Sequence, residues 1–311
     1  MPSWRRGRCT PTFPGILPKI TWKKASASCK RWATRAPGAW STILARTSTP
    51  WLPSSMPKCA TLWRSWWGGN GYMANQLDAE TILALQKRWE RIRVANLYDA
   101  LDQMGYYNQC LDLGIRPLFP RRRLAGMAVT VRGVRDPLDY HALSKQGKEP
   151  PPAQTTASLN SVLFPGAVVV VDGGGEVFTG KFGEMTSWNL KQRGAKGIVI
   201  DGYIRDWLGL EVIPDYTPCA RGTSPIESAR RWRIIAVNLP IAMPGTLTSQ
   251  VAVNPGDWVV AEADGVIIVP QEIADEALVK AEEIERREEG MRQDLAAGMS
   301  FDEAYQKWGR A

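Results

Sequence analysis

Three runs of apolar residues stand out in the second half of the chain, and each meets an Asp-Gly pair. They are the segments 167–175, 197–206 and 258–270, in which Val and Ile predominate. Continuous apolar runs bounded by glycine are typical of strands that are buried on both faces. The segment 124–134 alternates apolar and polar residues, which also predicts a strand. We therefore expect these segments to form the central sheet.

Helical patterns precede, separate and follow the strands. A helix is expected from Asp78, which can cap it, and another over residues 95–105. A charged helix is expected from Ile273, and Ser300 with Glu303 forms the capping-box pattern of a last short helix. Buried strands alternating with helices indicate an α/β fold.

Charge divides the chain into two regions. The net charge is +8 over 311 residues, but residues 1–72 hold 12 of the 39 Lys and Arg and none of the 31 Asp and Glu. We therefore separate a basic leader, residues 1–72, from a mildly acidic body, residues 73–311. The leader has no hydrophobic period, so we expect it to be disordered or to result from a misplaced start codon before Met73. A transit peptide and a basic arm for RNA are the alternatives, while the acidic body disfavours a nucleic-acid partner.

The cysteines and the hydropathy indicate a compartment. The body contains only Cys110 and Cys219, which are too few for a disulfide framework and fit a reducing cytoplasm. No apolar run reaches the ~18 residues of a membrane-spanning helix, so we expect no membrane segment.

Three charged residues lie where the first two buried strands should end. Glu184 opens the helix expected after the strand at 167–172, and Arg205 and Asp206 follow the strand at 197–201. A strand-helix-strand unit makes a right-handed crossover, so both strands end at the same edge of the sheet, where α/β proteins bind ligands. An exposed ion pair and a first-turn carboxylate without any function would give the same pattern.

The helix start and the Arg-Asp pair suit complementary ligands. Arg205 can hold a carboxylate through two N–H groups, and Asp206 can bind a cation. Further donors would come from the backbone N–H groups at the helix start, at Gly183, Glu184, Met185 and Thr186. An anion-binding arginine and backbone N–H groups beside a cation ligand fit a 2-oxo acid that chelates a metal.

The residues that the body lacks limit the kind of metal. His141 is the only histidine and the two cysteines are far apart in sequence, which disfavours a zinc site of His and Cys ligands. Carboxylate and water oxygens select Mg²⁺ or Mn²⁺. His141 is expected at the surface rather than as a catalytic base.

At these residues the sequence resembles the family of the regulator of ribonuclease activity A. This family includes class II pyruvate aldolases acting on 4-hydroxy-4-methyl-2-oxoglutarate and related oxaloacetate decarboxylases. The similarity extends from about Ala95 to Lys307, and the leader has no counterpart. The segments that carry it are "PGAVVVVDGGG", the "GE" that opens a helix, "GAKGIVIDGYIRD", "NPGDWVVAEADGVIIVP" and "RREEGMRQDLAAG".

The resemblance implies a role for each residue of the predicted site. Asp206 would bind the divalent metal, and Arg205 would hold the substrate and stabilise the developing enolate. Glu184 matches the acidic residue that orients or deprotonates a water near the metal. The amides of Met185 and Thr186 would hold the pyruvyl carboxylate.

The resemblance also implies an architecture and an assembly. The fold would be a three-layer β/β/α arrangement like a swivelling phosphohistidine domain, assembled as a ring-shaped trimer or a hexamer. A Glu from a neighbouring subunit's C-terminal helix would complete the site, and Glu288 aligns best, with Glu285 and Glu289 as alternatives. The chain departs from the family in the longer loop 136–156 and at Glu262, where an Asp is usual. Within that loop, the segment 144–156 is expected to be irregular, because its three prolines exclude a helix or a central strand.

The implied function is therefore a metal-dependent lyase. It would release pyruvate by retro-aldol cleavage of 4-hydroxy-4-methyl-2-oxoglutarate-type substrates, by decarboxylation of oxaloacetate, or by both. The alternative is a non-catalytic regulator that binds a ribonuclease or an RNA helicase, for which Arg205 and Asp206 would be dispensable.

Overall fold

A computed structural model describes residues 77–138, 140–149 and 156–309. The predicted leader, residues 1–72, lies outside the described residues, as does the central part of the proline-rich loop.

Eight strands of the described part form one curled sheet. They are β1 (Arg116–Pro117), β2 (Leu124–Arg135), β3 (Ala167–Asp172), β4 (Gly197–Ile200), β6 (Thr217–Ala220), β8 (Trp232–Val237), β11 (Trp258–Glu262) and β12 (Gly265–Val269). The neighbours β2, β3, β4 and β6 are parallel, whereas β1, β8, β11 and β12 pair antiparallel to theirs. Strand β1 contacts β11 and β12 at the far end of the sheet, so the sheet closes into a near-barrel.

Two small sheets and a set of helices complete the described part. The strand pairs are β5 (Tyr203–Ile204) with β7 (Gly222–Thr223), and β9 (Ile241–Met243) with β10 (Val251–Val253). The helices are α4 (Ala79–Trp89), α5 (Val94–Gln103), α6 (Tyr140–Lys145), α7 (Thr156–Asn160), α8 (Glu184–Gln192), α9 (Trp207–Glu211), the 3₁₀ turn η1 (Gln271–Ile273), α10 (Ala274–Ala296) and α11 (Phe301–Trp308).

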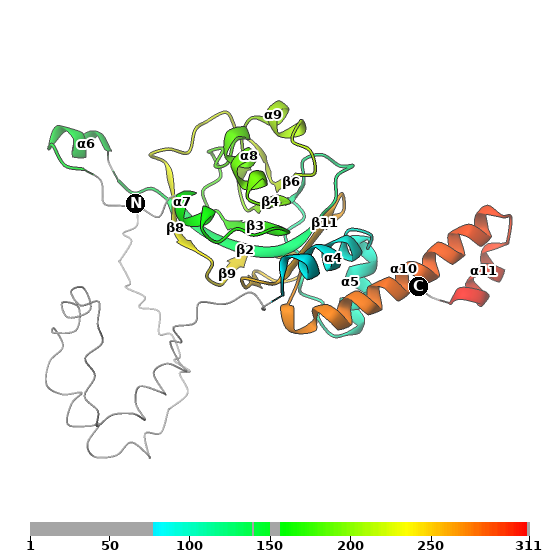
Figure 1. The fold of residues 1–311 in the computed structure, drawn as a ribbon. Coiled ribbons are helices and arrows are strands. Elements are labelled where there is room, and N and C mark those ends of the chain that lie inside the picture. Colours follow the sequence, from blue (N-terminus) through cyan, green and yellow to red (C-terminus); the bar gives the residue numbers. More distant parts are fainter. Residues whose placement is uncertain (1–76, 139, 150–155, 310–311) are drawn as a thin grey trace, which may run out of the picture. The chain divides into compact units, whose positions relative to one another are not determined.

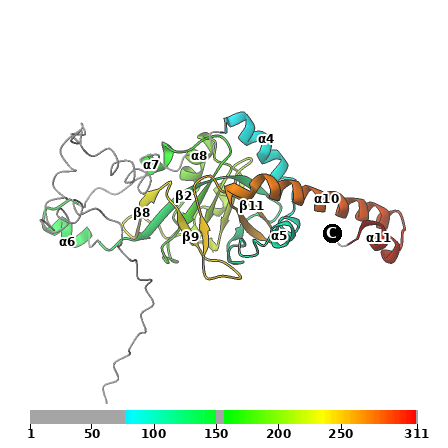
Figure 2. The ribbon, with the colours of Figure 1, turned by 90° about the horizontal axis from the view of Figure 1, so that it is seen from below.

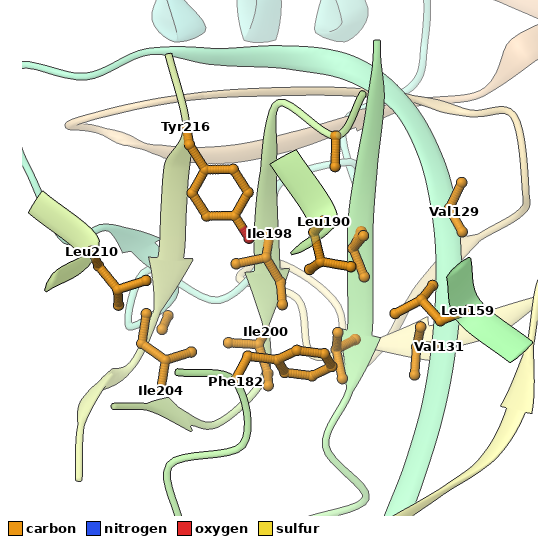
Figure 3. Close-up of a cluster of buried hydrophobic side chains, with 14 of the residues drawn as sticks. Val129, Val131, Leu159, Phe182, Leu190, Ile198, Ile200, Ile204, Leu210 and Tyr216 are labelled. Atoms are coloured by element: carbon orange, nitrogen blue, oxygen red, sulfur yellow. The ribbon is translucent and has the colours of Figure 1, made fainter. Parts of the chain in front are cut away.

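The curled sheet buries apolar side chains on both faces. Even-numbered positions of β2, such as Leu124 and Ala128, face the interior together with residues of β9 and β10. Odd-numbered positions face the helices: Val129 and Val131 lie in the core shared with α7, α8 and α9, shown in Figure 3. Met127, from the same strand, packs with α4, α5 and α10. The two groups of helices therefore cover different stretches of the outer face (Figure 1), and α10 runs alongside α5 (Figure 2).

The structure confirms the predicted α/β class with helices at both ends, while the narrower label of a swivelling domain stays a prediction. Asp78 caps α4 by accepting a hydrogen bond from the amide of Thr81 at 2.7 Å, and the Ser300 capping box is present. His141 is exposed, as predicted.

Two details of the sheet differ from the sequence pattern. The alternating segment 124–134 is buried on both faces over most of its length, because the near-closed sheet leaves little of it facing solvent. The run 258–270 is a hairpin of two strands rather than one, in which Asp264 lies in the turn and Gly265 opens β12. Among the described residues, no helix is long and apolar enough to cross a membrane.

Candidate functional site

The crossover from β3 through α8 to β4 places the predicted site residues at one edge of the sheet. β3 and β4 pair in parallel, so their carboxyl ends lie side by side. Glu184 is the first residue of α8, and Gly183 precedes it as the N-cap. Arg205 and Asp206 follow β5 and lead into α9. The predicted meeting of the helix start with the Arg-Asp pair is therefore what the fold produces.

A short backbone ladder aligns these two segments. Gly180 forms a parallel bridge with Tyr203, and the amide of Lys181 donates to the carbonyl of Tyr203 at 2.9 Å. Further along, the amide of Arg205 donates to the carbonyl of Phe182 at 3.2 Å. We call residues 180–184 and 203–206 together the site ladder. It fixes the backbone of Arg205 against the segment that opens α8.

Asp206 links the two halves of the site through its side chain. Its Oδ2 accepts a hydrogen bond from the amide of Glu184 at 3.1 Å, and its Oδ1 accepts one from Nε of Arg205 at 3.3 Å. Its backbone is left-handed, with φ 64° and ψ 48°, a conformation that Asp adopts more readily than most residues.

The amides at the start of α8 are only partly available. The prediction that the Glu184 N–H is free was wrong, because this group donates to Asp206. The amides of Met185 and Thr186 have no acceptor within the described part of the chain, as an exposed helix start allows. These two groups still provide the donors predicted for an anion.

Three glycines make room for the charged side chains. A Cβ at Gly183 would lie 2.4 Å from Oδ2 of Asp206, and one at Gly180 would lie 2.6 Å from Cβ of Arg205. A Cβ at Gly209, in α9, would lie 2.0 Å from Oε2 of Glu184. The carboxylate of Glu184 therefore reaches across to α9, where only glycine leaves space for it.

The electrostatics leave Arg205 with unused donors. Arg205 and Asp206 keep 34% and 40% of their side chains exposed, so their mutual attraction is partly screened. The terminal guanidinium nitrogens of Arg205 have no hydrogen-bond partner among the described residues. The group can therefore bind an incoming anion without breaking an existing contact.

Sequence reasoning missed a buried ion pair beside the site. Nζ of Lys181 lies 2.7 Å from Oε2 of Glu176, and both side chains are almost fully buried. Burial by itself would raise the pKa of Glu176, but hydrogen bonds from Lys181 and Thr179 outweigh it, and the pKa is lowered. Periodicity gave no signal for this pair, because both residues lie in an irregular glycine-rich loop; the one clue was a Glu and a Lys flanking apolar residues in "EVFTGK".

The donor set suits one kind of cation. Within residues 77–138, 140–149 and 156–309, no group of three or more His, Cys, Asp or Glu lies together to cage a metal. Asp206 offers one half-exposed carboxylate, each oxygen of which accepts a single hydrogen bond from the protein. A Mg²⁺ ion that keeps waters and takes substrate oxygens fits such a site, whereas an ion needing several protein ligands does not.

The C-terminal glutamates are held elsewhere in the chain. Oε2 of Glu288 accepts hydrogen bonds from Nδ2 of Asn96 at 3.0 Å and from Arg292 at 2.9 Å. Glu285 shares both partners, and Glu289 pairs with Arg292. The glutamate face of α10 is therefore partly a hydrogen-bonded network with α5 rather than a purely solvated surface. Its role in a neighbouring subunit's site stays a prediction.

Comparisons with known proteins agree on one family. The model described as RraA-like (Aldolase/RraA) matches residues 94–268, more than half of the chain. A Cupriavidus necator protein named "Putative 4-hydroxy-4-methyl-2-oxoglutarate aldolase" is 31% identical over 138 residues, covering 42% of this chain and 79% of the relative. A Halalkalibacterium halodurans protein of the same name is 29% identical over 141 residues, covering 45% of this chain; the match spans 64% of that relative, less than two thirds of its length.

A solved structure supports the same assignment of the fold. It is described as Streptomyces coelicolor RraAS2, an unusual member of the RNase ES inhibitor RraA protein family. It superposes with a TM-score of 0.57 at 26% identity, covering 68% of this chain and 97% of that one.

Proposed function

Because this chain belongs to the Aldolase/RraA family, we propose that it is a divalent-metal-dependent lyase that releases pyruvate from a 2-oxo acid. The observation that carries the proposal is the contact of Asp206 with both Arg205 and the amide of Glu184. This contact places a cation ligand, an arginine with unused donors and a helix start within one small region.

The protein residues bind and orient the substrate. The free amides of Met185 and Thr186 hold the carboxylate of the 2-oxo acid at the positive end of α8. Arg205 donates to the oxygen on which negative charge develops as the bond beyond C3 breaks, so it stabilises the enolate more than the ground state.

Glu184 provides the base that removes the proton of the C4 hydroxyl group. In retro-aldol cleavage, a base must take the proton from the C4 hydroxyl, and Glu184 does so through a water that it orients. Decarboxylation of oxaloacetate needs no such base, because the leaving group carries no proton. Loss of Glu184 should therefore impair the aldol reaction more than the decarboxylation.

The metal is Mg²⁺ or Mn²⁺, held by Asp206. When bound there, it would supply a Lewis acid that withdraws electron density from the 2-oxo group. The match of one carboxylate with water and substrate oxygens supports this choice.

The exposed apolar residues around the site support an oligomer. Phe178, Met185, Leu208 and Val212 leave 66%, 70%, 77% and 68% of their surfaces exposed. They belong to the loop before α8, to the start of α8 and to α9, and exposed apolar side chains on the segments that carry a site are typical of a surface covered by another protein. We propose a homotrimer or a hexamer in which Glu288 of a neighbouring subunit completes the site.

The test is the release of pyruvate by the full chain. Pyruvate is followed with lactate dehydrogenase from oxaloacetate and from 4-hydroxy-4-methyl-2-oxoglutarate, with Mg²⁺ or with EDTA. Reactions without protein correct for the spontaneous decay of oxaloacetate. Turnover that needs the metal and is lost in Arg205→Ala and Asp206→Asn supports the lyase. Turnover that survives both substitutions contradicts it.

A regulator is the second candidate, favoured by the likeness to a structure described as a member of an RNase inhibitor family. In that case ribonuclease inhibition should persist in Arg205→Ala and Asp206→Asn, because the binding surface would not depend on those side chains. Inhibition lost together with turnover would count against a separate regulatory surface.

A further inference from the structure

The buried pair of Lys181 and Glu176 has every hydrogen-bonding group satisfied. The ammonium of Lys181, with no exposed side-chain surface, donates to Oε2 and the carbonyl oxygen of Glu176, both at 2.7 Å, and lies 3.4 Å from the carbonyl of Thr179. An ammonium has three donors, so none is left over. The carboxylate of Glu176 accepts in addition from the amides of Phe178 and Thr179 and from the hydroxyl of Thr179 at 2.7 Å. The hydrogen bonds of the pair therefore hold the loop 176–179 in one conformation.

The same ammonium lies close to the other half of the site. A Cβ at Gly202 would lie 2.8 Å from Nζ of Lys181, so the chain that leaves β4 passes near the charge and leaves no room for a side chain there. One residue later the site ladder begins, where the amide of Lys181 donates to Tyr203. Lys181 therefore contacts the loop before α8 and the turn before Arg205 at once.

The stability of the fold does not explain why a buried ion pair stands here rather than two apolar side chains. Removing two charges from water costs several kcal/mol, and well-packed apolar residues in place of a buried ion pair are often as stable or more so. Trp232, whose ring centroid lies 5.9 Å from Nζ of Lys181, makes a cation–π contact with the charge, which offsets only part of the cost of removing two ions from water. What the ion pair adds is a defined shape: its hydrogen bonds hold the loop 176–181 in one conformation, and in that conformation the ammonium lies close to the turn at Gly202.

We propose that Lys181 is a positioning residue for the candidate site. Held by Glu176, it sets the distance between the start of α8 and the Arg205-Asp206 segment, on which the contact between Asp206 and the Glu184 amide depends. This inference rests on the proposed function, since it predicts a loss of turnover. It also predicts a change in backbone protection that needs no turnover.

The test uses a pair of substitutions in the full chain. Lys181→Met alone leaves Glu176 buried and unpaired, so it should lower the melting temperature and need not fold. The double variant Lys181→Met/Glu176→Gln removes both charges and keeps an acceptor for the loop amides, so it should recover most of that loss. The control is Arg123→Met/Glu262→Gln, which removes a more exposed 3.1 Å ion pair at the opposite edge of the sheet.

Two readouts are made on the double variant. Hydrogen–deuterium exchange should be about tenfold faster in peptides covering the site ladder, and kcat should fall about tenfold with a smaller change in KM, because small misplacements act on the transition state. The control should show neither change. A double variant with wild-type exchange in the site ladder, or with wild-type kcat, overturns the proposal.

Failure of the lyase proposal can be distinguished from failure of the positioning role of Lys181. If the wild-type protein releases no pyruvate from either acid, the lyase proposal fails, and exchange in the site ladder alone decides the role of Lys181.

Discussion

The two edges of the parallel strands use arginine in opposite ways. At the amino edge, Nη1 of Arg122 donates to the carbonyls of Tyr216 at 2.8 Å and Ile213 at 3.2 Å, and Nη2 donates to that of Glu211. At the carboxyl edge, Arg205 makes one long contact with Asp206 and keeps its terminal nitrogens free of partners within the described residues. Both side chains are partly exposed, so exposure does not separate them.

The difference lies in the donors that remain unused. Arg122 donates to the carbonyl groups at the end of α9 and in the turn that leads to β6. Its donors are therefore used to stabilise the fold. Arg205 is aligned by backbone contacts on its own amide, which leaves the guanidinium for a ligand. The same residue type is structural in one place and a candidate for catalysis in the other.

The largest expected effect comes from removing the charges at the carboxyl edge. Arg205→Ala and Asp206→Asn should each lower kcat/KM for pyruvate release by about 10² to 10³ fold, because each removes stabilisation that develops in the transition state. The free energy of unfolding should change by less than about 1 kcal/mol, since the pair is exposed and Asn tolerates the left-handed backbone. Steady-state kinetics and urea unfolding check both values.

The reverse result is expected at the amino edge. Arg122→Met should lower the free energy of unfolding by about 2 kcal/mol, because several carbonyl groups at the end of α9 lose their donor. The kcat of the folded protein should be unchanged. Arg121→Met, at the exposed neighbour, is the matched control and should shift stability by less than about 0.5 kcal/mol. A loss of kcat in Arg122→Met with unaltered stability would reverse the comparison.

A buried carboxyl away from both arginines gives a third kind of behaviour. Burial raises the pKa of Asp257 to about 6, although the amides of Asn254 at 2.7 Å and Gln271 at 3.1 Å donate to it. The folded protein then holds this proton more tightly than the unfolded chain. The contribution to stability is present at low pH and is lost as the pH rises from the unfolded value of 3.8 through about 6.

Urea unfolding at several pH values tests this expectation. Between about pH 4 and pH 7, wild-type protein should lose roughly 2 kcal/mol of unfolding free energy relative to Asp257→Asn, which does not titrate. Parallel curves for the two proteins would show that Asp257 does not carry the effect.

The smallest expected effect probes the space for Glu184. Gly209→Ala places a methyl group where Oε2 of Glu184 lies, so the carboxylate must move away. We expect kcat for retro-aldol cleavage to fall about tenfold, while alanine in a helix leaves stability equal or higher. Oxaloacetate decarboxylation should change less. Equal losses on both substrates would mean that Glu184 is not the base.

The carboxyl-edge site was predictable because it follows from local pattern and crossover handedness. The apolar runs that became β3 and β4, and the helix between them, suffice to bring Glu184 and Asp206 to one edge. The hydrogen bond from the Glu184 amide to Asp206 was not predictable, because it depends on the left-handed backbone at Asp206 rather than on sequence spacing.

Other features depend on tertiary closure. Whether both faces of 124–134 are buried is decided by the contact of β1 with β11 and β12, which no local periodicity encodes. The pairing of Lys181 with Glu176 arises in an irregular loop, where neither period 2 nor period 3.6 applies. The hairpin at 258–270 shows that an Asp-Gly pair within an apolar run is a turn signal as well as a strand end.

The glycines against which the charged side chains rest bear on how function is inferred across relatives. Arg205, Asp206 and Glu184 each lie where a Cβ on Gly180, Gly183 or Gly209 would collide with them. A homologue that keeps all three charged residues but carries a larger residue at one of these glycines would match the catalytic signature and yet have impaired activity, because a charged side chain would have to move. Assigning activity within the family therefore requires inspection of positions that carry no functional group at all.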